Sequence, residues 1–100
     1  MSEQLNEAIA RLEQHTAAGL ALLPDDLQLV LQGTPGEFRR VLGSALFDIN
    51  AGAATDYGRG LDFGRALGII TAGAALELIS HTQQDALAAA LAQVKPHDGA

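Results

Sequence analysis

The sequence of 100 residues has no cysteine and no tryptophan, and it is poor in basic residues. Without cysteine, the chain has no thiolate metal site, thiol nucleophile or disulfide framework, but this absence does not assign a compartment. Six Lys and Arg residues stand against twelve Asp and Glu residues, which gives a formal charge of −6. Because affinity for nucleic acid comes from Lys and Arg that displace counterions, this balance disfavours direct binding to nucleic acid and suits a basic protein partner.

A long apolar run and a basic leader are also missing. The longest uncharged apolar stretch is the 11 residues between Arg65 and Glu77, well short of the roughly 18 to 20 that a spanning helix requires. The first residues show no basic region followed by an apolar run, which a secretory signal would need. We therefore expect no membrane segment and a cytoplasmic location.

The apolar residues that are present favour helices. Leu supplies 16 residues and Ala 19, whereas Val and Ile together supply 8 and the aromatic residues 4. Leu and Ala favour helices, while sheets are rich in β-branched and aromatic residues. A chain of this length can bury enough surface to fold without a disulfide or a structural metal. We expect an all-α fold, with a single domain over residues 1–100.

Apolar residues at intervals of three and four predict about five helices. Gly19 and Gly33 are expected to end the first two. Thr34 and Glu37 are expected to form a capping box at the start of the third, and residues 82–85 a similar one at the start of the last. With short turns between them, these helices predict a compact antiparallel bundle. The expected ranges are 3–18, 24–32, 35–50, 61–80 and 82–95.

Two segments are expected to lack regular structure. Residues 50–60 combine small residues, three glycines and the only tyrosine, so they predict the longest connection, followed by a helix that opens at Leu61 or Asp62. Residues 96–100 are expected to be a frayed tail. Because loops often carry contacts, and Tyr and Arg dominate interface hot spots, Tyr57 and Arg59 are candidate binding residues. A tyrosine in such a loop can equally fold over its own core.

Small residues recur at every fourth position of the fourth predicted helix, at Gly60, Gly64, Gly68 and Ala72. Such a row lets another backbone approach closely. The simpler interpretation is a close crossing with the third helix, and the alternative is a contact between molecules. Gly73, in the same helix, is a position at which it can kink or split.

No catalytic or metal-binding constellation is visible. The histidines at positions 15, 81 and 97 lack carboxylates at ligand spacing, apart from Asp85 four residues after His81, which we interpret as a polar cluster at a helix start. No Ser-His-Asp set can be identified from spacing, and no phosphate-binding glycine loop follows a strand. We therefore expect a protein that is not an enzyme and has no cofactor or metal.

The candidate partner-binding residues are mainly acidic. Asp25 and Asp26 lie at one helix start, and three further aspartates bracket residues 50–60. Individually such carboxylates are mostly helix caps or solvated side chains, but jointly they predict an acidic face. The full predicted set is Asp25, Asp26, Asp48, Asp56, Tyr57, Arg59 and Asp62.

A resemblance to a known group of proteins rests on three segments: the helix start Thr34-Pro35-Gly36-Glu37, the glycine-rich residues 50–60 and the segment 61–68. In these features, in length, in acidity and in its Ala/Leu-rich helical pattern, it resembles small phage-encoded anti-CRISPR proteins, more narrowly inhibitors of the type I-F CRISPR surveillance complex. The resemblance implies a non-catalytic protein, in the cytoplasm of a bacterial host cell, that binds Cas subunits of the crRNA-guided complex and keeps target DNA off it. Acidity fits this implication, because a site that recruits DNA presents Lys and Arg.

The expected mechanism is steric and electrostatic occlusion by a monomer, in which carboxylates pair with basic residues and Tyr57 fixes the register. Two alternatives stay open. One is a small phage or bacterial structural or assembly protein that self-associates through the glycine row. The other is an acidic chaperone for a basic partner. A self-assembling protein should grow heavier with concentration, whereas a monomeric inhibitor should not.

Overall fold

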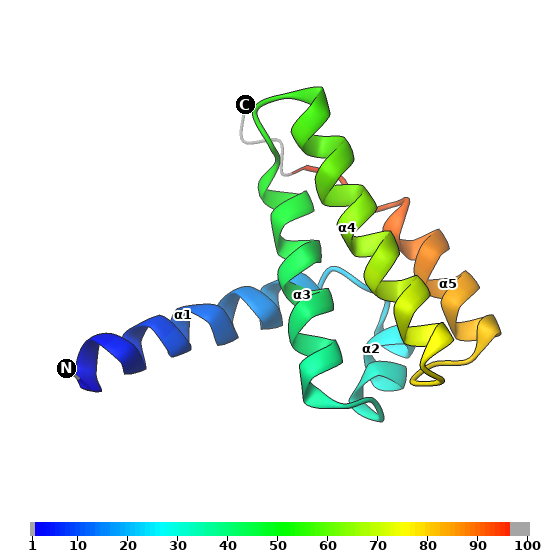
Figure 1. The fold of residues 1–100 in the computed structure, drawn as a ribbon, viewed down its shortest axis with the longest axis horizontal. Helices are drawn as coiled ribbons and strands as arrows, with labels where there is room; N and C mark the ends of the chain where they lie inside the picture. Colours follow the sequence, from blue (N-terminus) through cyan, green and yellow to red (C-terminus); the bar gives the residue numbers. More distant parts are fainter. Residues whose placement is uncertain (1, 97–100) are drawn as a thin grey trace.

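The computed structural model describes residues 2–96, and within that range it contains α-helices and short connections but no strand (Figure 1). The prediction of an all-α, single-domain bundle of five helices is confirmed. The predicted frayed tail lies, from residue 97 on, outside the described residues. The helices are α1 (Ser2–Leu20), α2 (Asp25–Gln32), α3 (Gly36–Ala51), α4 (Asp56–Ala75) and α5 (His81–Leu91).

The hydrophobic core lies between α2, α3, α4 and α5. Helix α3 packs on α4, α4 packs on α5, and α2 packs on α5. The apolar positions of α3 follow the three- and four-residue spacing of the sequence, so a single face of this helix points inward. Burying one such Leu or Ile side chain contributes about 1.5–3 kcal/mol. The largest fully buried side chains are Leu31, Leu42, Leu46, Ile70, Leu87 and Leu91.

The start of α3 differs from the predicted capping box. Pro35 occupies the N-cap position, and no side chain caps the helix. The buried Thr34 hydroxyl instead donates to the carbonyl oxygen of Leu31 at 2.6 Å. Arg39 donates to the same carbonyl at 3.2 Å. Thr34 therefore satisfies the end of α2 rather than the start of α3.

A capping box does begin α5, but two residues before the predicted one at residues 82–85. The N–H of Gln83 donates to the Ser80 hydroxyl at 3.0 Å, and the N–H of Ser80 donates to the Gln83 side chain at 2.8 Å. This helix ends at Leu91, before the predicted limit at Pro96. The residues between Leu91 and Pro96 form turns and irregular chain.

The prediction of a long connection at residues 50–60 is wrong. Helix α3 continues to Ala51 and α4 begins at Asp56, so only residues 52–55 connect them. Thr55 is the N-cap, and its hydroxyl accepts a hydrogen bond from the N–H of Gly58 at 3.0 Å. The Asp56 carboxylate then lies near the positive end of the helix dipole. The longest connection is instead residues 76–80, because α4 ends at Ala75.

Gly19 lies one residue before the end of α1, close to its predicted role as a stop, and it also packs against another helix, which was not predicted. Helix α1 continues to Leu20, and Gly19 is buried where α1 crosses α3. A Cβ atom at Gly19 would lie 1.8 Å from the carbonyl oxygen of Gly43, and one at Gly43 would lie 2.6 Å from that of Thr16. The two helix backbones are thus in contact, which the missing side chains permit. His15 stacks on Phe47 beside this crossing, with ring centroids 4.2 Å apart.

The glycine row of α4 does not face α3, so the prediction of a close crossing there is wrong. A Cβ atom at Gly60, Gly64 or Gly68 would have no neighbour within 4 Å apart from its own helix. The glycine of α4 that packs against α3 is Gly73, where a Cβ atom would lie 2.6 Å from the ring of Phe38. Gly73 neither splits nor ends the helix.

The N-terminal part of α1 extends away from the other helices (Figure 1). Residues 2–15 are exposed, apart from the partly covered Ala8. Leu5, Ile9 and Leu12 expose 61%, 44% and 57% of their surface. The radius of gyration is 13.8 Å, against about 12.7 Å for an average domain of this length. Only the last turns of α1 attach it to α3.

Replacing Gly43 with alanine is expected to destabilise the fold by about 1–3 kcal/mol, because the new methyl group collides with a backbone oxygen that cannot rotate away. Gly64→Ala is the matched control. Its methyl group enters open space, and the loss of a helical glycine should raise the free energy of unfolding by about 0.5–1 kcal/mol. Urea unfolding followed by circular dichroism measures both. Equal effects of the two substitutions would contradict the contact between α1 and α3.

Candidate interaction surface

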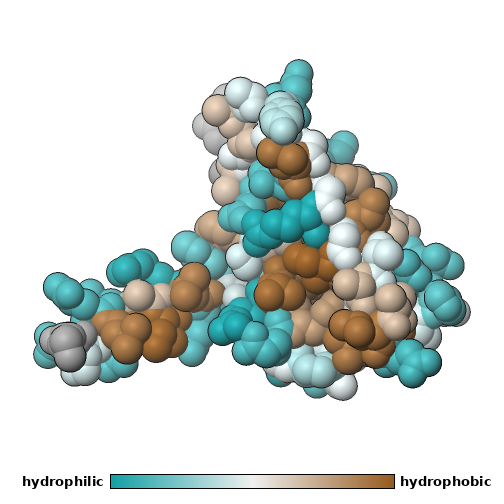
Figure 2. All heavy atoms as spheres, in the orientation of Figure 1, coloured by the Kyte–Doolittle hydropathy of each residue, from teal (hydrophilic) through white to brown (hydrophobic). Residues whose placement is uncertain are grey.

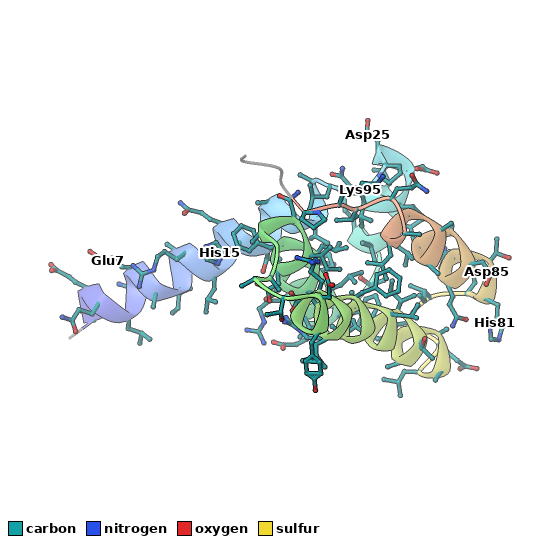
Figure 3. All side chains as sticks on the ribbon, turned by 90° about the horizontal axis from the view of Figure 1, so that it is seen from above. Glu7, His15, Asp25, His81, Asp85 and Lys95 are labelled. Carbon is teal, nitrogen blue, oxygen red and sulfur yellow. The ribbon has the colours of Figure 1, made fainter. Side chains whose placement is uncertain are left out.

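The predicted acidic residues lie at two separate places. Asp25 and Asp26 are exposed in the first turn of α2. Figure 3 shows Asp25 pointing outward, on the side of the molecule away from α4. The other three lie near the C-terminal end of α3 and the N-terminal end of α4. The five carboxylates therefore do not share one continuous face.

Asp48 is already paired within the chain. The Arg65 guanidinium donates to the Asp48 carboxylate at 2.7 Å and to the Ser44 hydroxyl at 3.2 Å. The pair joins α3 to α4, and both side chains are about half exposed. A partner that uses Asp48 must therefore compete with Arg65.

Asp56 and Arg59 also form an ion pair, across the first turn of α4. The guanidinium of Arg59 in addition donates to the carbonyl oxygen of Ala53 at 3.1 Å. Arg59 thereby ties the connection before α4 to the helix. Arg59 and Asp62 line a small cavity of about 160 Å³, together with Ile49, Phe63, Val94 and Pro96.

Tyr57 does not fold over the core. Its side chain is 72% exposed, and Leu61, one turn later, is 58% exposed. Gly64 and Gly68 continue the same side of α4 at intervals of three and four residues, and both are exposed. We call these four residues the α4 face. It is an apolar, uncharged helix surface that a partner can approach closely, with the carboxylates of Asp56 and Asp62 beside it.

A second surface lies where α1 leaves the body, and the sequence did not reveal it. The exposed residues Leu5, Ile9 and Leu12, which we call the α1 stripe, lead into two adjoining grooves. A groove of about 340 Å³ between α1 and α3 is lined by Ile9, Leu12 and Arg39, among others. Figure 2 shows apolar residues of α1 and of the body on the same side of the molecule.

The second groove, of about 430 Å³, lies between α1, α3 and α4. Its apolar lining includes Leu12, Val41 and Ile69, and its charged lining is Arg40 and Arg65. We call the two together the arginine grooves. They hold three of the six basic residues of the chain, Arg39, Arg40 and Arg65, whereas Glu13 is the one carboxylate among their lining residues.

The structure also tests two expectations about metal binding and membrane segments. Within residues 2–96, no three His, Asp or Glu side chains are placed to hold a metal ion. His81 contacts Gln84 through its Nδ1 atom at 3.3 Å, as expected for a polar cluster at a helix start. Among the described helices, none has the length and apolar character needed to cross a membrane.

The ion pair of Asp48 with Arg65 is expected to contribute less than about 1 kcal/mol to stability, because both groups are half exposed and screened by water. Asp48→Asn should therefore leave the free energy of unfolding nearly unchanged, so that any loss of partner binding reports the carboxylate itself. Urea unfolding of Asp48→Asn, Arg65→Gln and the double variant gives the coupling energy. A coupling well above that value would show that the pair supports the fold.

Comparison with known proteins adds no relative: no family model, no curated protein and no solved structure matches this chain.

Proposed function

We propose that this chain is a non-catalytic protein that acts by binding another protein. The α4 face carries the proposal, because an exposed tyrosine and an exposed leucine adjoin a row of glycines that packs against nothing in the chain. Tyrosine is enriched among residues that dominate binding energy. Contiguous exposed apolar surface marks interaction sites more reliably than scattered residues do.

For the partner, we propose a basic protein surface, and specifically Cas subunits of a type I-F crRNA-guided complex in the cytoplasm of a bacterial host. The formal charge of −6 supports a basic partner. So do Asp25, Asp26 and Asp62, which form no ion pair within residues 2–96. The resemblance of the sequence to small phage inhibitors supports the narrower choice. Occupying the Lys and Arg residues that recruit DNA blocks target binding without catalysis.

A self-associating helical assembly protein is the second candidate. The open glycine row of α4 favours it, because a helix of another copy can approach Gly60, Gly64 and Gly68 without meeting a side chain. This candidate predicts a mass that keeps rising with concentration. It also predicts that Gly64→Leu blocks the association.

Tyr57→Ala is expected to weaken binding to the purified type I-F complex by about 30-fold, the equivalent of a 2 kcal/mol hot spot. Stability should hardly change, because the side chain is mostly exposed. Leu29→Ala is the matched control, since Leu29 is similarly exposed but lies on α2. Binding of each soluble variant to surface-immobilised complex measures the two affinities. Equal affinities for the two variants would exclude the α4 face as the contact.

Reversing Asp25 and Asp26 to lysine is expected to slow association with the same complex, because charges at the rim of an interface act mainly on the association rate. The rate for the unmodified protein should also fall between about 50 and 500 mM salt, as screening shortens the reach of the charges. Asp85→Lys, at the start of α5 (Figure 3), is the control. An association rate that changes neither with salt concentration nor with charge reversal would contradict the electrostatic part of the proposal.

A further inference from the structure

Along one side of α1, a row of residues that we call the α1 seam has a covered end and an exposed end. Leu5, Ile9, Leu12, Thr16 and Gly19 follow each other at alternating intervals of four and three residues, the spacing of a helix that packs along another helix. The inner end of this seam is covered, because Thr16 and Gly19 contact α3. The outer end is the α1 stripe, which is exposed. Within residues 2–96, the same face thus continues past the body, and no helix covers its outer end.

The arginine grooves begin where the α1 stripe ends. Ile9 and Leu12 of the stripe are themselves groove-lining residues. Beyond Leu12, the apolar lining passes over Val41 and Ile69 to Leu76, which is also exposed. A projecting apolar stripe and an apolar groove are therefore parts of one continuous surface.

The charges of these two parts are opposite. The projecting part of α1 carries the carboxylates of Glu3 and Glu7 and the guanidinium of Arg11, while Glu13 is itself a groove-lining residue. The grooves carry the three arginines named above. Arg40 and Arg65 also pair with Glu37 and Asp48, but neither of those acids lines an arginine groove. An acidic amphipathic helix is the occupant that this lining fits, and α1 is such a helix.

The accessible surface of the chain is larger than that of an average monomer of the same mass, and the excess is similar to the area that one ordinary interface buries on each partner. The accessible surface is 6439 Å², whereas a compact monomer of 10.4 kDa exposes about 5,400 Å². The excess is about 1,000 Å², and a stable interface buries about 800 Å² on each partner. The excess is large enough for one partner of standard size.

We propose that the occupant is a second copy of the chain, in place of the monomer that the sequence suggested. Helix α1 of each protomer lies in the arginine grooves of the other. A two-fold dimer uses the same patch on both subunits, so helix and groove must lie side by side on one molecule. The α1 stripe and the arginine grooves meet this condition. The resulting assembly is closed and does not grow further.

Sedimentation equilibrium of the purified full chain over a tenfold concentration range tests the proposal. The expected mass is twice the 10.4 kDa of one chain. The double variant Ile9→Glu, Leu12→Glu should have the mass of a single chain with an unchanged circular dichroism spectrum, because both side chains are exposed in the protomer. Leu29→Glu is the control and should remain a dimer. Arg40→Glu should weaken the dimer, whereas Asp85→Lys should not.

Three results would overturn the proposal: a single-chain mass for the unmodified protein up to about 100 µM, a mass that keeps rising with concentration, or a dimer that survives the double variant. Because the chain has no cysteine, Gln4→Cys accepts a single fluorophore on α1. Energy transfer between mixed donor and acceptor chains should appear only in the dimer and vanish in the double variant. Tyr57 and Leu61 line neither arginine groove, so a monomer would leave the proposed function standing.

Discussion

The contact between the backbones of Gly19 and Gly43 is the constraint on which the rest of the surface depends. It brings α1 across α3 so closely that no Cβ atom fits on either side. Because the crossing uses only the last turns of α1, the preceding residues lie beyond the edge of the body. The exposure of Leu5, Ile9 and Leu12 is therefore a consequence of where two glycines meet, and so are the two adjoining grooves beside the crossing.

The number of helices could be predicted from the sequence, because a helix with one apolar face repeats its apolar residues every three to four positions. The roles of the glycines could not. Glycine ends helices, and it also lets two helices touch. Gly19 lies near the end of α1, as a stop does, yet it also packs against α3, whereas Gly64 resembles a packing residue yet faces open space. Local sequence does not say which other helix, if any, lies opposite.

The residues of the candidate site show the same limit of prediction from local sequence. Thr55 is the N-cap of α4 and Asp56 is the acidic residue of its first turn, so both signals of a helix start are in the sequence. Three glycines nearby favoured a loop, and the helix was therefore predicted to begin too late. The pairing of Asp48 with Arg65 joins residues 17 positions apart on different helices. Such a pair follows from how α3 crosses α4, which no local pattern encodes. The α1 stripe repeats at intervals of three and four residues like the buried face of another helix, and periodicity alone cannot tell a covered face from an exposed one.

Net charge and charge position have different consequences for this protein. Two copies that each carry −6 repel one another, so association requires local attraction that exceeds this repulsion. The arginine grooves place half of all basic residues where an acidic helix would lie, and they leave Asp25 and Asp26 on a separate helix. A dimer would double the negative charge presented to a basic partner. Under these two proposals, arginines concentrated in one place would let an acidic chain associate with itself and still present carboxylates to a basic surface.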